Sequence, residues 1–237
     1  MRVNEIISSV EEGVDDPHIF KAVFMAGGPG SGKSRIADSP ILKGGGLRPI
    51  NSDDVYEYKM KKAGLDYGDP DVIYSDQGQE IRNRAKEVTA KREKMYLDGR
   101  LGVIIDGTGR NLDKISGAVE KLTQMGYSCM MVFVNTSLDI AQERNLLRDR
   151  TLKPAEVERM WNDVQNNMMK FQQLFGQGKF QIVDNNGGLE DPERKKNFDK
   201  VQKNISAWLN KPPSNPHAKK WIENERRKKT ATNQQEK

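Results

Sequence analysis

The most constraining feature of this 237-residue chain is a glycine-rich stretch near its beginning. Residues 27–34 read Gly-Gly-Pro-Gly-Ser-Gly-Lys-Ser and match the pattern G-x-x-x-x-G-K-[ST] at every required position. A short apolar segment, 22–26, precedes the stretch, and residues 35–37 can continue it as a helix. This strand–loop–helix context favours a phosphate-binding loop over a glycine-rich turn that matches by chance, and it indicates an α/β fold.

The residue types in this loop suit a nucleoside triphosphate. Glycines let the backbone bring amide N–H groups close to phosphate oxygens. Lys33 supplies a mobile positive charge for the terminal phosphates, and the Ser34 hydroxyl can bind magnesium. We therefore expect ATP or GTP with Mg²⁺ at the loop. The expected nucleotide-binding residues are Gly28, Pro29, Gly30, Ser31, Gly32, Lys33, Ser34 and Arg35.

Apolar segments alternate with amphipathic helical patterns along the chain. A continuous apolar run such as 101–105 is typical of a strand buried on both faces of a parallel sheet. This alternation predicts a P-loop NTPase-type parallel sheet covered by helices on both faces, with a helical lid. We expect the stretch 64–79 to be a turn-rich loop near the site, and one long helix from Pro154 to Leu174. The other expected strands are 22–26, 47–51, 127–134 and 180–184.

The distribution of charge suggests a domain followed by a tail. We expect one domain over residues 1–210, with a helical extension within residues 1–20, and a basic, flexible tail over residues 211–237. The tail holds eight Lys or Arg residues against three Glu, and so accounts for the whole net charge of +5. Such a tail can contact nucleic acid or can simply be a solvated chain end.

The composition argues against several classes of protein. No apolar run approaches the roughly 20 residues of a membrane-spanning helix, and the first residues lack the apolar core of a secretory signal. The single cysteine, Cys129, lies in an apolar run, which favours a buried reduced thiol. The two histidines, His18 and His217, are far apart, which argues against a zinc site or imidazole catalysis. We therefore expect a cytoplasmic protein without membrane contact.

Carboxylates follow two of the expected strands. Asp53 comes after the segment 47–51, and Asp106 comes after 101–105. Because the carboxyl ends of parallel strands meet at the edge that carries the phosphate loop, both carboxylates are expected on the ligand side. Ser52 or Asp53 could cap the helix that follows, but Asp53 and Asp54 cannot both be caps, and we favour a catalytic or magnesium-linked role for one of these two carboxylates. Asp106 can hold magnesium through water or bind a hydroxyl of the acceptor.

Arginines recur on two expected helices. Arg144 and Arg148 are four residues apart, so we expect them on one face of the helix that starts at Leu138. With a phosphate loop in the chain, we favour a closing segment that neutralises phosphoryl charge over simple pairing with Glu143. The helix expected over 80–98 has a charged face that we expect to be solvated, with acceptor binding by one of its cations as the alternative. These cations are Arg82, Arg84, Lys91 and Arg92.

Over residues 23–188 the order of these landmarks resembles the phosphate-loop kinases that include the zeta toxins and the 5′-hydroxyl polynucleotide kinases. The segment Asn-Ser-Asp-Asp at 51–54 is similar to the strand-end motif of both groups, and the resemblance implies Asp53 as general base. Both groups tend to have an arginine three residues later, where this chain has Tyr56. The segment Glu-Arg-Asn-Leu-Leu-Arg at 143–148 is similar to the lid of the polynucleotide kinases.

The stretch Val-Ile-Ile-Asp-Gly-Thr-Gly-Arg at 103–110 resembles the part of the zeta toxins that touches a sugar-nucleotide acceptor. This similarity implies acceptor-binding roles for Asp106, Thr108 and Arg110. The resemblance as a whole implies an ATP- or GTP-dependent kinase that transfers the γ-phosphoryl group to a hydroxyl. The implied catalytic residues are Lys33, Asp53, Arg144 and Arg148, with Ser34 and Asp53 at the metal.

The acceptor stays open at this point. It is either a 5′-hydroxyl of a nucleic acid, with contacts from the basic tail, or a sugar nucleotide such as UDP-N-acetylglucosamine. The alternative from another class is a P-loop module that binds or hydrolyses nucleotide and acts through a protein or nucleic-acid partner.

Overall fold

A single parallel sheet organises the protein. The computed structural model describes residues 13–40, 42, 46–148, 151–187 and 191–235. Within these residues, five parallel strands pair in the order β2-β3-β1-β4-β5. This confirms the predicted α/β fold. The strands are β1 (Lys21–Ala26), β2 (Arg48–Ile50), β3 (Val103–Asp106), β4 (Ser128–Asn135) and β5 (Phe180–Asp184).

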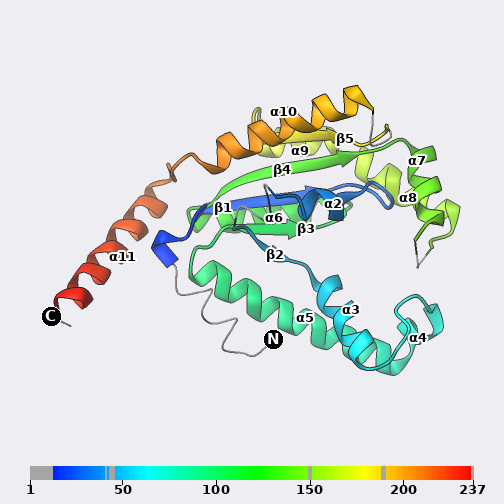
Figure 1. Ribbon diagram of the computed structural model, residues 1–237, viewed down its shortest axis with the longest axis horizontal. Coiled ribbons are helices and arrows are strands. Elements are labelled where there is room, and N and C mark those ends of the chain that lie inside the picture. The colour runs from blue at the N-terminus through cyan, green and yellow to red at the C-terminus, as the bar shows by residue number, and fades with distance from the viewer. Residues whose placement is uncertain (1–12, 41, 43–45, 149–150, 188–190, 236–237) are drawn as a thin grey trace.

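Helices cover both faces of the sheet (Figure 1). On one face, Phe24 and Phe133 lie in a core to which α6 (Leu112–Gln124) and α9 (Met168–Phe175) contribute. On the other face, the core around Met25 includes residues of α2 (Lys33–Ala37) and α10 (Pro192–Leu209). Alternate side chains of a strand enter different cores, which explains why the central strands read as unbroken apolar runs.

The chain between β2 and β3 forms a helical unit with its own small core. Tyr56 and Met60 are buried in it against Ala85. The stretch 64–79 is therefore not the plain loop we expected, because it contains one short helix and the start of another. The longer helix begins early because the Ser75 hydroxyl caps it by accepting from the Gly78 amide. The three helices are α3 (Ser52–Lys62), α4 (Pro70–Tyr74) and α5 (Asp76–Asp98).

Two helices, α7 (Leu138–Leu146) and α8 (Pro154–Gln165), lie at the end of the sheet toward which the strands point (Figure 1). The single helix expected from Pro154 to Leu174 is divided, because α8 ends at Gln165 and α9 begins at Met168. Asn167 lies at the break, and its buried Nδ2 donates to the carbonyls of Gly109 (3.0 Å) and Arg110 (2.9 Å). The break thus lets one side chain bind the loop after β3.

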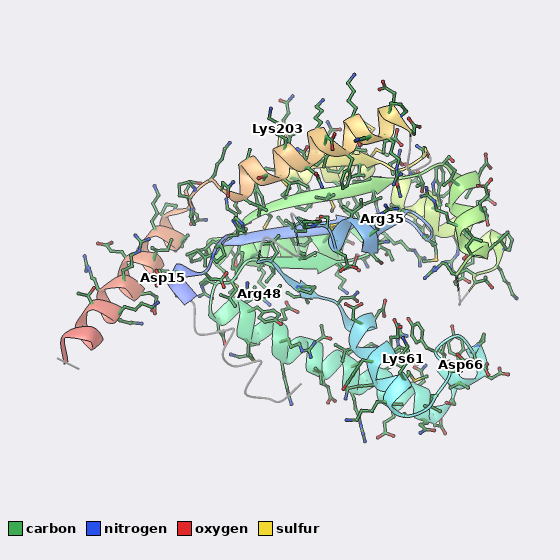
Figure 2. The ribbon with its side chains drawn as sticks, viewed as in Figure 1. Asp15, Arg35, Arg48, Lys61, Asp66 and Lys203 are labelled. Atoms are coloured by element: carbon green, nitrogen blue, oxygen red, sulfur yellow. The ribbon has the colours of Figure 1, made fainter. Side chains whose placement is uncertain are left out.

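The basic segment over residues 211–237 contains a helix, α11 (Pro216–Gln235), where we expected a flexible tail. Its first turns pack on the domain: Ala218 is buried, and the Trp221 ring lies 5.4 Å from the Phe20 ring, edge to face. Lys229 pairs with Asp15, labelled in Figure 2, at 2.6 Å. The apolar contacts of Ala218 and Trp221 therefore hold this segment against the domain, and a count of its charges does not reveal them.

The helix α11 lies at the opposite end of the sheet from α7 and α8 (Figure 1). The helical extension expected within residues 1–20 lies largely outside the described residues, which begin at Gly13 with the short 3₁₀ helix η1 (Gly13–Asp15). None of the described helices is long and apolar enough to cross a membrane.

Candidate active site

The phosphate loop, residues 27–34, connects β1 to α2 at the carboxyl edge of the sheet. Gly30 and Gly32 have φ values of +72° and +84°. A Cβ atom would lie 2.5 Å from the Ala141 carbonyl oxygen at the first position, and 2.5 Å from Asn185 Nδ2 at the second. Both positions therefore require glycine, for conformation and for space.

Lys33 folds back over the loop. Its Nζ donates to the carbonyl oxygens of Gly27 (2.7 Å) and Gly28 (3.5 Å). Burial lowers the pKa of Lys33, while the negative charges of Asp106 and Asp53 oppose that shift. The ammonium group thus lies near both strand-end carboxylates, and it can exchange backbone carbonyls for phosphate oxygens when a nucleotide binds.

Several polar atoms at this edge suit a magnesium–nucleotide complex. Ser31 Oγ and Asp106 Oδ1 are buried without a hydrogen-bond partner among the described residues. Ser34 is exposed at the start of α2. The described parts of the chain contain no group of three His, Cys, Asp or Glu side chains that would hold a metal alone. The ligands of a Mg²⁺ ion here would be the Ser34 hydroxyl, a carboxylate, phosphate oxygens and water, a combination that this ion usually has.

Asn51 connects the Asp106 carboxylate to the backbone of Asp53. Its Nδ2 lies 3.3 Å from Asp106 Oδ2 as donor, and its Oδ1 accepts from the Asp53 amide at 2.9 Å. Asn51 is therefore the N-cap of α3, and neither Asp53 nor Ser52 has the capping role considered from the sequence. Burial raises the pKa of Asp106; the positive charge of Lys33 opposes this shift.

The arginines of the expected lid lie in different settings. Arg144 is on α7, and its Nη1 lies 3.5 Å from the Gly30 carbonyl oxygen. Burial lowers the pKa of Arg144, and the nearby charge of Arg194 adds to this effect. Because α7 ends at Leu146, Arg148 lies beyond the helix and does not share a helical face with Arg144. Its positive charge nevertheless contributes to the lowered pKa of Lys33.

The remaining candidate residues lie in the loop after β3 and on α2. Thr108 is exposed, and its carbonyl accepts from the Gly27 amide at 3.1 Å, which ties this loop to the phosphate loop. Arg110 binds Asp163 of α8 through Nε and Nη2, each at 3.0 Å. Arg35 is exposed on α2, where Figure 2 labels it. The structure thus brings Asp106 and Thr108 to the phosphate loop, and it directs Arg110 toward α8.

Asn185 supports the phosphate loop from the end of β5. It is 4% exposed. Its Nδ2 donates to the Ser31 carbonyl at 2.6 Å, and its Oδ1 accepts from Arg194 Nε at 2.9 Å. Asn185 was not among the site residues predicted from the sequence. An asparagine in Asn-Asn-Gly-Gly carries no pattern that distinguishes such a contact from a turn residue.

Comparisons with known proteins bear on the family and the fold of the chain. Residues 9–200 match the family model for zeta toxin. A chain of the AvrRxo1-ORF1:AvrRxo1-ORF2 complex with ATP has a TM-score of 0.55 at 13% identity, over 84% of this chain and 70% of that chain. A chain from the PezAT chromosomal toxin–antitoxin system of Streptococcus pneumoniae has a TM-score of 0.53 at 15% identity, over 88% of this chain and 98% of that chain.

No curated protein sequence matches the chain. The two structural likenesses establish a shared fold, and the family match covers most of the chain. The family and its kinase fold support a nucleotide-dependent phosphotransferase. The chain belongs to the zeta toxin family.

Proposed function

We propose that the protein transfers the γ-phosphoryl group of ATP or GTP to a hydroxyl group of a compact acceptor. The observation that carries this proposal is a cavity lined by both strand-end carboxylates, Asp53 and Asp106, and the negative charge of each opposes the lowering of the pKa of Lys33. Lys33 and the loop amides bind the β- and γ-phosphates. Ser34 and Asp53 would hold Mg²⁺, which would neutralise charge on the phosphate oxygens when bound.

The chemical step needs a base and a positive clamp. Asp53 accepts the proton of the acceptor hydroxyl while the hydroxyl oxygen attacks the γ-phosphorus. The bond from this phosphorus to the β–γ bridging oxygen breaks, and the nucleoside diphosphate leaves with that electron pair. Arg144 and Arg148 neutralise charge on the transferring group, a role for which an arginine can contribute about 10³-fold or more in rate.

A cavity beside the carboxylates supports a compact acceptor. It has a volume of about 370 Å³ and is lined by Asp53 and Asp106. This volume lies in the usual range for small-molecule sites, about 300–1,000 Å³. Its lining combines apolar side chains with three lysines and three carboxylates, which suits a polar, charged molecule such as a sugar nucleotide. The apolar residues are Ile50, Ala90, Leu97, Ile105, Ala118 and Leu122, the lysines are Lys86, Lys114 and Lys121, and the carboxylates are Asp53, Glu93 and Asp106.

The position of α11 bears on the alternative acceptor. A 5′-hydroxyl of a nucleic acid was favoured partly by the basic segment over residues 211–237. That segment forms α11 at the other end of the sheet from α7 and α8 (Figure 1), so its charge is not beside α3, the helix that carries Asp53. We therefore place the sugar nucleotide ahead of the polynucleotide as the acceptor.

The test is transfer of labelled γ-phosphate from ATP and from GTP, in the presence of Mg²⁺, to three acceptors: UDP-N-acetylglucosamine, free nucleosides and a 5′-hydroxyl oligonucleotide. We expect transfer to the sugar nucleotide and its loss in Asp53→Asn. A polynucleotide acceptor would instead show transfer that falls steeply with salt. Nucleotide binding or hydrolysis without transfer to any acceptor would refute the kinase and favour a nucleotide-binding module.

A further inference from the structure

One cation of the supposedly solvated face of α5 lies beside Asp53. Arg82 has its Nη2 atom 3.8 Å from Asp53 Oδ1. Its Cζ atom lies 5.1 Å from the centre of the Tyr56 ring. Because Tyr56 follows Asp53 by three residues on α3, the ring and the carboxylate lie on the same side of that helix. The guanidinium therefore contacts the aromatic ring and the carboxylate together.

The ring beneath Arg82 is held in place by packing. Tyr56 is 1% exposed, within the core of the α3–α5 unit. Its ring packs edge-on against the Tyr67 ring, with the centres 5.5 Å apart. The Tyr56 hydroxyl has no hydrogen-bond partner in the described part of the chain. The contact with Arg82 thus depends on the aromatic face and not on the hydroxyl.

These contacts add little to folding stability. The side chains of Arg82 and Asp53 remain 34% and 63% exposed. An exposed ion pair and an exposed cation–π contact each contribute little to the free energy of unfolding. Their larger effect is on orientation, because an exposed aspartate with two side-chain torsions otherwise points in several directions.

We propose that Arg82 is a positioning residue for the general base: seated on Tyr56, it selects the orientation of Asp53 that faces the phosphate loop. This inference rests on the proposed function, in which Asp53 accepts the acceptor proton. The positioning charge comes from α5, whereas the base is on α3, so the packing of the two helices sets the geometry of the reaction.

The expected effect is on turnover. Misplacing a reacting group by about 1 Å can cost about 10²-fold in rate, so Arg82→Ala is expected to lower kcat by about 10- to 100-fold. The KM for ATP should stay within about twofold, because Arg82 does not touch the phosphate loop. Arg82→Lys keeps the charge without the planar group and should recover part of the rate. Tyr56→Phe should act like the wild type, and Tyr56→Leu should reproduce the loss.

The experiment measures kcat and KM for ATP with the acceptor identified in the screen above. Arg84→Ala is the matched control, because Arg84 follows Arg82 by two residues on α5, lies on the opposite side of that helix, and is exposed and paired with Glu80. Its rate should equal that of the wild type. Arg82→Ala is also combined with Asp53→Asn. If Arg82 acts through Asp53, Arg82→Ala should lower kcat no further in a protein that already carries Asp53→Asn. If Arg82→Ala instead causes a general structural defect, the two losses in kcat should add.

Melting curves accompany each variant. If Tyr56→Leu unfolds, Arg82→Ala and Arg82→Lys decide the matter, because neither removes atoms from the small core. If the wild type transfers phosphate and Arg82→Ala has the same rate as Arg84→Ala, this inference is overturned and the proposed function is not. Absence of transfer by the wild type would overturn the proposed function, and this inference with it.

Discussion

The contact from Asn185 to the phosphate loop gives a prediction whose size follows from the structure. Asn185→Ala removes one neutral hydrogen bond, to the Ser31 carbonyl, and one from the charged Arg194 guanidinium. Bonds of these two kinds contribute about 0.5–1.5 and 1.5–3 kcal/mol, so we expect a loss of about 2–4 kcal/mol in the free energy of unfolding. For a chain of this size, that lowers Tm by roughly 5–15 °C.

The same variant should weaken nucleotide binding. A loop that spends only about a tenth of its time in the binding conformation has an apparent Kd about tenfold higher. Asn185→Asp is the informative companion, because it keeps a partner for Arg194 but sets a carboxylate oxygen against the Ser31 carbonyl. Its negative charge beside the triphosphate should weaken binding further than alanine does, while its stability loss is smaller.

The assay is urea or thermal unfolding together with titration calorimetry of Mg–ATP. Asn204→Ala is the control, because Asn204 is an exposed residue of α10 that donates to Gln181 near the start of β5, at the opposite end of that strand from Asn185. It should change stability by less than about 0.5 kcal/mol. If Asn185→Ala matched this control in both Tm and Kd, the assigned role of Asn185 would be wrong.

Three further predictions concern other parts of the molecule. Burial raises the pKa of Asp106 above its ordinary value of 3.8, so the stability of the wild type should fall as the pH rises from 3.8 to the raised pKa. Asp106→Asn should remove this fall and raise Tm at neutral pH while impairing phosphate transfer; melting curves from pH 4 to 8 and the transfer assay measure these effects. Burial raises the pKa of Cys129 to about 11, so a thiol reagent at pH 8 should label it only when the protein unfolds; rapid labelling of the folded protein would contradict this. Trp221→Ala should cost about 2 kcal/mol by chemical denaturation, less than the 3–5 typical of a fully buried aromatic residue, whereas an unchanged midpoint would mean that α11 does not pack on Phe20 in solution.

The sequence predicted those parts of the fold that local pattern determines. The loop over 27–34 and the apolar strands were found because glycine spacing and unbroken hydrophobic runs are properties of short segments. The division between α8 and α9 was missed because the apolar spacing continues across it, and only the contact of Asn167 with the loop after β3 explains it. The helix α11 was not predicted because the many charged residues of this segment outweighed its few apolar contacts with the domain, made by Ala218, Trp221 and Ile222.

The candidate site shows the same limit. Lys33, Asp53 and Asp106 could be chosen because each follows a strand or ends a motif, but Asn51, Arg82 and Asn185 act across distances in the chain that no motif covers. Tyr56 illustrates the difficulty: in the sequence it is a departure from the arginine of related kinases. In the structure, Arg82 lies over that ring, so a guanidinium stands near Asp53 after all, supplied by another helix.

These second contacts share a physical logic. Asn51 holds Asp106, Asn185 holds the Ser31 carbonyl, and Arg82 lies against Asp53; in each case an element other than the nearest strand fixes a polar group of the site. Fixed dipoles and charges need not reorganise during phosphoryl transfer, which is how such sites lower a barrier. Exposed groups such as Asp53 gain most from this arrangement, since packing alone does not restrict them. Loss of the exposed contact of Arg82 should therefore reduce turnover more than stability. Loss of the buried contact of Asn185 should reduce both turnover and stability.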